Sequence, residues 1–263
     1  MMSAKEPIVL TIAGFDPSGG AGIIADVRTL VHFGVRPAAA ITSLTFQNSE
    51  RVFGATHETA ESLRAQVLPV AEEGGIAALK IGMLPTADLV GEVARLLAET
   101  DLPAPVIDPV LQSSSGYQLT EKEAVDALVT ELLPLTRLLT PNIPEAEMLT
   151  GLQIRGEEDM REAAAMIRAI GAQGVLIKGG HLAPESQDSP RLAIDLLDGE
   201  GGVTVFRDEW IDSPPVRGTG CILSSAIAAC LARGMNLEKS IGAGKEFVSE
   251  TIRRAASLSA QTL

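Results

Sequence analysis

Short aliphatic runs alternate with longer amphipathic runs along the chain, and this alternation limits the possible folds more than any other feature. The strand-like runs cover Ile8 to Ala13, Ala38 to Leu44, Ala77 to Ile81, Pro105 to Asp108, Arg137 to Thr140, Gly174 to Lys178, Leu192 to Leu197 and Val203 to Phe206. Helical periodicity covers Gly20 to Phe33, Glu58 to Glu72, Thr86 to Glu99, Glu121 to Leu133, Glu157 to Ile170, Gly220 to Ala232 and Leu237 to Ala256. This order predicts an α/β fold with a mostly parallel central sheet covered by helices on both faces.

The last two strand-like runs are separated only by the turn residues Asp198 to Gly202, which predicts a hairpin that adds antiparallel strands at one edge of the sheet. We find no linker and no internal repeat, so residues 1–263 are expected to form a single domain. The polar, proline-containing segment Ala183 to Pro190 is expected to be an exposed loop. Ligands of open α/β sheets bind beyond the carboxyl ends of the strands, so the residues that follow each strand are the candidate site.

Charge and composition exclude several classes of function. The chain carries 21 Lys and Arg against 34 Asp and Glu, a net charge of −13 that disfavours binding to nucleic acid or an anionic membrane. Cys221 and Cys230 lie in one apolar helical stretch, which disfavours a disulfide framework. No apolar run approaches ~20 residues, and the first residues lack a signal-peptide pattern. These features predict a soluble, cytoplasmic protein.

The most informative motif is Gly218-Thr219-Gly220-Cys221, because it opens a long helix of small residues. Free backbone N–H groups and the positive end of the helix dipole form an anion site there, and glycine lets phosphate oxygens approach the backbone. Cys221 is expected in the first turn, where a thiol pKa tends to fall. The alternative is an ordinary glycine-rich turn before a buried helix, with Cys221 serving only in packing.

A second glycine-rich segment, Gly14 to Gly22, follows the first strand and leads into the first helix. Gly20 to Ala25 fits the loose dinucleotide pattern G-x-G-x-x-A, but Ala38 to Thr45 lacks the acidic residue which that reading requires. A nicotinamide or flavin enzyme is therefore a distant alternative. The pattern G-x-x-x-x-G-K-[ST] is absent from the sequence, which disfavours a P-loop nucleotidase.

Further polar residues follow other strands of the predicted sheet. They are Gln47, Lys80, Asp108, Asn142, Glu145 and Lys178. Taken singly, each fits an ordinary loop or helix cap. Together at one edge of a sheet, carboxylates, cations and an anion hole are the parts that phosphoryl transfer needs. Gln47 can donate and accept hydrogen bonds, which suits an aminopyrimidine, and Met83 suits the face of a flat ring.

These motifs, taken in order, resemble the hydroxymethylpyrimidine/phosphomethylpyrimidine kinases of thiamine biosynthesis, within the ribokinase superfamily. The resemblance runs from about Val9 to about Val248. It is carried by Leu10-Thr11-Ile12-Ala13-Gly14, Asp16-Pro17-Ser18-Gly19-Gly20-Ala21-Gly22, Gln47-Asn48, Lys80-Ile81-Gly82-Met83, Asp108-Pro109-Val110, Thr140-Pro141-Asn142, Pro144-Glu145-Ala146-Glu147, Lys178-Gly179-Gly180-His181-Leu182 and Gly218-Thr219-Gly220-Cys221. It implies a ribokinase-like three-layer αβα sandwich.

The resemblance also implies a role for each matching position. The pyrimidine is expected to lie among Gln47, Gly14, Ala21, Asp26, Met83 and Val110. Gly218, Thr219 and Gly220 are expected to bind the transferring phosphate, with Cys221 taking the hydroxyl proton and Lys178 near the phosphates. Nucleotide binding is expected from Asn142, Glu145, Lys178 and Arg217, and Mg²⁺ binding from Asp108 and Glu145. ATP, Mg²⁺ and a small pyrimidine are the implied ligands, and a homodimer is the implied assembly.

Some positions depart from the family pattern. Pro215-Val216-Arg217 stands where the family usually has Asn-Thr-His, and Phe15 replaces a small hydroxyl residue. Arg217 adds a cation beside the expected phosphates, and Phe15 could reshape the ring pocket. The resemblance implies ATP-dependent phosphorylation of 4-amino-5-hydroxymethyl-2-methylpyrimidine and of its monophosphate. The alternatives are a pyridoxal or pyridoxine kinase and a non-catalytic pyrimidine-binding relative.

Overall fold

A computed structural model describes residues 6–113, 116–180 and 191–260. The strands are β1 (Ile8–Phe15), β2 (Arg36–Gln47), β3 (Val52–His57), β4 (Ile76–Ile81), β5 (Val106–Ile107), β6 (Leu138–Leu139), β7 (Val175–Lys178), β8 (Leu192–Gly199) and β9 (Gly202–Glu209). The helices are α1 (Gly22–His32), α2 (Ala60–Glu72), α3 (Ala87–Glu99), α4 (Lys122–Ala127), α5 (Ile143–Thr150), α6 (Glu157–Ile170), α7 (Thr219–Ala232) and α8 (Leu237–Ala260). Strands therefore alternate with helices as the sequence pattern predicted.

All the strands of this described part join one sheet in the order β3-β2-β1-β4-β5-β6-β7-β8-β9. Along this order, neighbouring strands from β2 to β7 pair in parallel. At the edges, β3 runs antiparallel to β2, β8 to β7, and β9 to β8. The chain passes from β1 to β2 on one side and later to β4 on the other. Such a change of direction opens a crevice beyond the carboxyl end of β1, where ligands bind in open α/β sheets.

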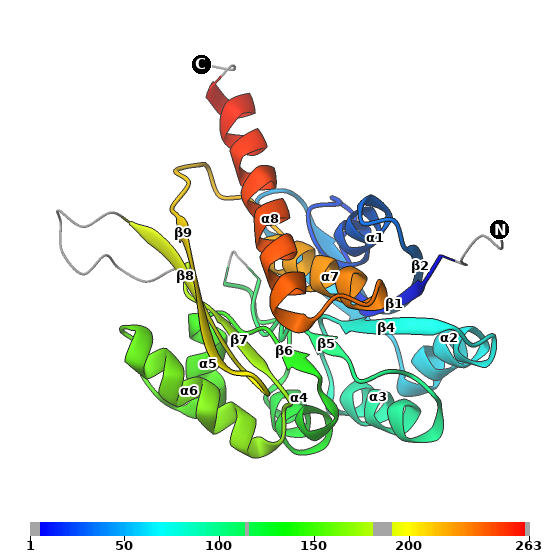
Figure 1. Ribbon diagram of the computed structural model, residues 1–263. Coiled ribbons are helices and arrows are strands. Elements are labelled where there is room, and N and C mark those ends of the chain that lie inside the picture. Colours follow the sequence, from blue (N-terminus) through cyan, green and yellow to red (C-terminus); the bar gives the residue numbers. More distant parts are fainter. Residues whose placement is uncertain (1–5, 114–115, 181–190, 261–263) are drawn as a thin grey trace, which may run out of the picture.

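Helices cover both faces of the sheet and form two apolar cores (Figure 1). Leu10 and Ile12 of β1 enter the core beneath α2 to α6, and Val9 enters the core beneath α1, α7 and α8. Successive side chains of a strand point to opposite faces, so an aliphatic strand supplies both cores at once. The three-layer αβα sandwich expected from the sequence is confirmed.

Two differences from the expected elements have local causes. The sequence predicted antiparallel strands at one edge, but β3 adds an antiparallel strand at the other edge as well. Its exposed, glycine-containing sequence lacks the aliphatic character of the inner strands. The expected helix from Glu121 to Leu133 is α4 followed by a wider π turn and a short 3₁₀ turn. The expected loop from Ala183 to Pro190 lies outside the described residues.

Within residues 6–113, 116–180 and 191–260, no helix combines the length and apolar character that crossing a membrane requires.

Candidate active site

A cavity of about 900 Å³ lies at the carboxyl ends of the parallel strands. Its wall includes the loop after β1, the starts of α5 and α7, and parts of β9 and α8. Most site residues predicted from the sequence line it: Gly14, Ala21, Gln47, Met83, Asp108, Val110, Asn142, Glu145, Lys178, Arg217, Gly218, Thr219, Gly220 and Cys221. The strand-end motifs therefore converge on one space, as the topology of the sheet requires.

The backbone at Gly218 brings the start of α7 against the loop after β1. Gly218 has φ +72°, and a methyl group at this position would lie 2.1 Å from the carbonyl oxygen of Gly20. Only glycine fits both the left-handed conformation and this close approach. No side chain caps α7, and its first turn contains no acidic residue. The first-turn amides can therefore receive an anion from the cavity.

Lys178 lies between two carboxylates beside this helix start. Its Nζ is 2.8 Å from Asp108 Oδ1 and 4.0 Å from Glu145 Oε2. Burial lowers the pKa of Lys178, but attraction to the two carboxylates outweighs it and leaves the pKa raised. A methyl group on Gly220 would lie 3.0 Å from Asp108 Oδ2 and 3.2 Å from Lys178 Nζ. The cation and the helix amides thus face the same region.

Glu145 is held by the start of α5. Asn142 Oδ1 accepts from the Glu145 N–H, and Glu145 Oε2 accepts from the Asn142 N–H at 2.7 Å, which completes a capping box. Burial raises the pKa of Glu145 to about 7, with Lys178 opposing and Asp108 adding to the rise. Its carboxyl group therefore exchanges protons near neutral pH.

Cys221 lies in the first turn of α7, 8% exposed, and both cysteines are free thiols. The expectation of a lowered thiol pKa is wrong. Burial raises the pKa of Cys221 to about 12, and the nearby Lys80 ammonium opposes this only in part. Desolvation of the thiolate outweighs its attraction to the Lys80 ammonium here.

Lys80 and Asp26 form a fully buried ion pair, with Lys80 Nζ 2.8 Å from Asp26 Oδ2. Asp26 also accepts hydrogen bonds from Thr11 and Ser225, so its carboxylate is satisfied inside the protein. Lys80 lines the cavity and Asp26 lies behind it, so the expected contact of Asp26 with the pyrimidine stays a prediction. A charged residue inside the aliphatic strand β4 was the sequence signal, because a buried lysine requires a carboxylate partner.

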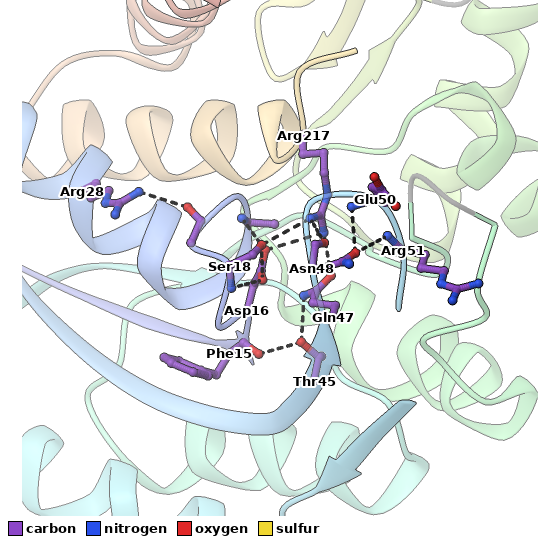
Figure 2. Close-up of polar contacts among 12 residues, drawn as sticks. Phe15, Asp16, Ser18, Arg28, Thr45, Gln47, Asn48, Glu50, Arg51 and Arg217 are labelled. Atoms are coloured by element: carbon purple, nitrogen blue, oxygen red, sulfur yellow. Dashed lines mark hydrogen bonds and ion pairs between the residues drawn. The ribbon is translucent and has the colours of Figure 1, made fainter. Parts of the chain in front are cut away.

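Gln47 and Arg217 meet at the end of the cavity beyond β1 and β2 (Figure 2). Arg217 Nη2 donates to Gln47 Oε1 at 2.6 Å, and Gln47 Nε2 donates to Thr45 Oγ1 at 2.7 Å. The Thr45 hydroxyl in turn donates to the Phe15 carbonyl. This chain of bonds sets the orientation of the Gln47 amide and leaves one N–H and one oxygen lone pair of the amide for a ligand.

The far end of the cavity is lined by residues that the sequence analysis did not single out. Arg191 lies 3.6 Å over the ring of Trp210, and Lys245 of α8 forms ion pairs with Asp195 and Asp208. All of them line the cavity. They lie on or next to β8, β9 and α8 rather than at the carboxyl ends of the parallel strands, where ligand-binding residues were expected.

A ribokinase-like sheet whose cavity places helix amides beside Lys178 defines a small-molecule kinase. A family model described as phosphomethylpyrimidine kinase matches residues 16–262. A hydroxymethylpyrimidine/phosphomethylpyrimidine kinase of Streptomyces coelicolor is 42% identical over 94% of this chain and 88% of its own. The chain therefore belongs to the phosphomethylpyrimidine kinase family.

Solved structures agree with this membership. A phosphomethylpyrimidine kinase of Clostridium difficile superposes with a TM-score of 0.82 at 36% identity, covering 94% of this chain and 100% of the other. An ADP complex of Bacillus subtilis pyridoxal kinase gives a TM-score of 0.83 at 36% identity, covering 93% and 91%. The fold of this chain is therefore shared with phosphomethylpyrimidine kinase and pyridoxal kinase.

Proposed function

We propose that this chain transfers the γ-phosphate of ATP to 4-amino-5-hydroxymethyl-2-methylpyrimidine and to its monophosphate, in thiamine biosynthesis. The supporting observation is that Gln47, Lys178, Cys221 and the start of α7 all line one cavity. A ring bound at Gln47 points its substituent along the cavity toward α7. In the expected geometry, the γ-phosphorus of ATP lies between the bound ring and the start of α7, and an oxygen of the ring substituent attacks it in line.

The first-turn amides of α7 and Lys178 stabilise the transferred phosphoryl group in this proposal. The amides are unpaired by side chains, and Lys178 stays protonated because Asp108 and Glu145 favour its charged form. Charge that develops on the transferring oxygens therefore meets preorganised donors. Asn142 lines the same cavity and is assigned to the nucleotide phosphates, whereas the guanidinium of Arg217 is bonded to Gln47, on the side of the acceptor.

The carboxylates fit Mg²⁺ that arrives with the nucleotide better than a resident metal. No set of three His, Cys, Asp or Glu side chains gathers as a metal site in the part of the chain that the structure describes. Mg²⁺ commonly uses one or two carboxylates together with phosphate oxygens and water. Asp108 and Glu145 would hold the ion, which would neutralise charge on the phosphates.

Cys221 is assigned as the base that receives the proton of the alcohol. It lines the cavity at the start of α7, beside the amides assigned to the phosphate. Because burial raises its pKa to about 12, the thiolate is scarce at neutral pH. The alcohol step is therefore expected to be limited by deprotonation, whereas an ionised phosphate acceptor needs no base.

An acceptor panel tests the proposal. We expect ATP-dependent phosphorylation of the hydroxymethylpyrimidine or its monophosphate, measured as ADP release, with kcat/KM at least tenfold above that for pyridoxal. Faster turnover of pyridoxal would instead assign the chain as a pyridoxal kinase, a function that the likeness to the B. subtilis enzyme favours. Pyrimidine binding without ADP release would assign a non-catalytic binding protein.

We also propose that the chain works as a cytoplasmic homodimer. The β2–β3 edge of the sheet exposes Leu44, Phe46 and Phe53, whose exposed fractions are 42%, 53% and 57%. Apolar side chains gathered on an edge are commonly covered by a second subunit. Light scattering is expected to give twice the 27.5 kDa chain mass, and a monomer at micromolar concentration would contradict the proposal.

A further inference from the structure

Arg217 ties together three segments that are far apart in the sequence (Figure 2). It precedes Gly218 directly, and its guanidinium donates to Gln47 Oε1 and the Asn48 carbonyl after β2. It also reaches Ser18 Oγ at 3.3 Å in the loop after β1. The side chain is 23% exposed and lines the cavity. A permanent cation therefore stands between the ring end of the cavity and the start of α7.

The hydrogen-bond partners of this cation are neutral oxygens. The nearest carboxylate, Asp16, is 3.6 Å from Nη2, beyond a normal hydrogen bond. Asp16 is already satisfied, because its two oxygens accept from Ser18 N, Ser18 Oγ and Ala21 N. Carbonyl and hydroxyl partners bind a guanidinium more weakly than a phosphate, which pairs with it in a charge-assisted, bidentate geometry.

Two other cations of the cavity are already matched with carboxylates. Lys80 lies 2.8 Å from Asp26, and Lys178 lies 2.8 Å from Asp108. An anionic substituent on a ring held at Gln47 would therefore gain more from Arg217 than from either lysine. A neutral hydroxyl substituent offers no charge to the guanidinium. Arg217 therefore binds an acceptor with a phosphate more strongly than an acceptor with a hydroxyl group.

We propose that Arg217 is a specificity-determining residue that binds the phosphate of a phosphomonoester acceptor and so favours the monophosphate over the free alcohol. The inference rests on the proposed function. On binding, the guanidinium keeps its Nη2 bond to Gln47 and exchanges the Nη1 bonds to Asn48 and Ser18 for phosphate oxygens of the acceptor. An oxygen of that phosphate then attacks the γ-phosphorus of ATP, and the bond from that phosphorus to the β–γ bridging oxygen breaks. The products are ADP and the diphosphate ester of the pyrimidine.

The charge state of the acceptor agrees with this preference. A phosphomonoester has a second pKa near 6, so at pH 7.5 its attacking oxygen carries no proton that must be removed. The alcohol, in contrast, must lose a proton to a thiol whose pKa burial has raised to about 12. Arg217 and Cys221 thus disfavour the alcohol for two separate reasons, one of binding and one of proton transfer.

The test compares Arg217→Gln and Arg217→Lys with the wild type on both acceptors. Glutamine can still donate to the neighbouring carbonyls, whereas lysine keeps the charge without the bidentate fork. We expect R217Q to lower the ratio of kcat/KM for the monophosphate to kcat/KM for the alcohol by about 10- to 100-fold. R217K should restore part of that ratio. Arg28→Gln is the matched control, because Arg28 supports the same loop through the Gly19 carbonyl but does not line the cavity.

The outcomes separate the inference from the function on which it rests. Equal losses on both acceptors in R217Q, with R217K no better, would make Arg217 a support for Gln47 and overturn the inference. A wild type that already prefers the alcohol would also overturn it. A wild type that phosphorylates neither pyrimidine would instead overturn the proposed function. Circular dichroism and the KM for ATP confirm that each variant is folded. If R217Q does not fold, the comparison is made with R217K alone.

Discussion

Replacing Gly218 with alanine is expected to lower turnover at least a hundredfold on every acceptor. The new methyl group would lie 2.1 Å from the Gly20 carbonyl oxygen and 3.1 Å from the Ala21 Cα, and the residue has φ +72°. The start of α7 and the loop after β1 must therefore move apart, which displaces the amides assigned to the transferred phosphate. Loss of a single oxyanion-type donor costs about 10²–10³ in rate.

Gly34→Ala is the matched control for this variant. Gly34 has φ +69°, close to that of Gly218, but no heavy atom lies within 4 Å of its added methyl group. It therefore carries the same backbone strain, of about 1–2 kcal/mol, without the collision. We expect G34A to lower the unfolding temperature while leaving kcat within about twofold. Similar turnover in G34A and G218A would remove the α7 amides from the mechanism.

Replacing Cys221 with alanine is expected to affect the two acceptors differently. Turnover of the alcohol should fall at least tenfold, with little change in the KM for ATP, because the variant lacks a group to receive the hydroxyl proton. The loss on the alcohol should exceed the loss on the monophosphate by at least tenfold, since an ionised phosphate needs no base. Steady-state kinetics on both acceptors measure the difference.

A pH series checks the same assignment independently. Below a thiol pKa of about 12 the thiolate fraction rises about tenfold per pH unit, so turnover of the alcohol should rise relative to the monophosphate between pH 7 and 9. Glu145, whose pKa is about 7, affects both acceptors and cancels in their ratio. The ratio should be flat in C221A. A ratio in the wild type that does not change with pH, or unchanged alcohol turnover in C221A, would remove Cys221 as the base.

Local patterns were sufficient for most of the fold. Aliphatic runs identified β1, β4 and β7, because a strand buried on both faces needs apolar residues at nearly every position. The same reasoning failed for β3, an exposed edge strand with no such requirement. It also did not detect the π turn after α4, since a change in backbone winding leaves the apolar periodicity almost intact.

The site residues also divide into those that local patterns predicted and those that they did not. The glycines of the Gly218 motif could be recognised because an anion site at a helix start depends on neighbouring residues in the chain. The partnership of Asp26 with Lys80 was not recognised, because the two residues are 54 positions apart and meet only through the packing of α1 against the sheet. The sequence accordingly predicted a ligand contact for Asp26 and gave no sign of its buried ion pair with Lys80.

By itself the sequence determined the alternation of strands and helices, the order of the motifs and the edge of the sheet at which they gather, because these depend on residue type and spacing. Tertiary structure alone decided the pKa of the Cys221 thiol and the partners of Arg217. The first depends on how completely water is excluded from the start of α7, and the second joins residues 170 positions apart. Burial and long-range contact are properties of the packed chain, and no local pattern encodes them.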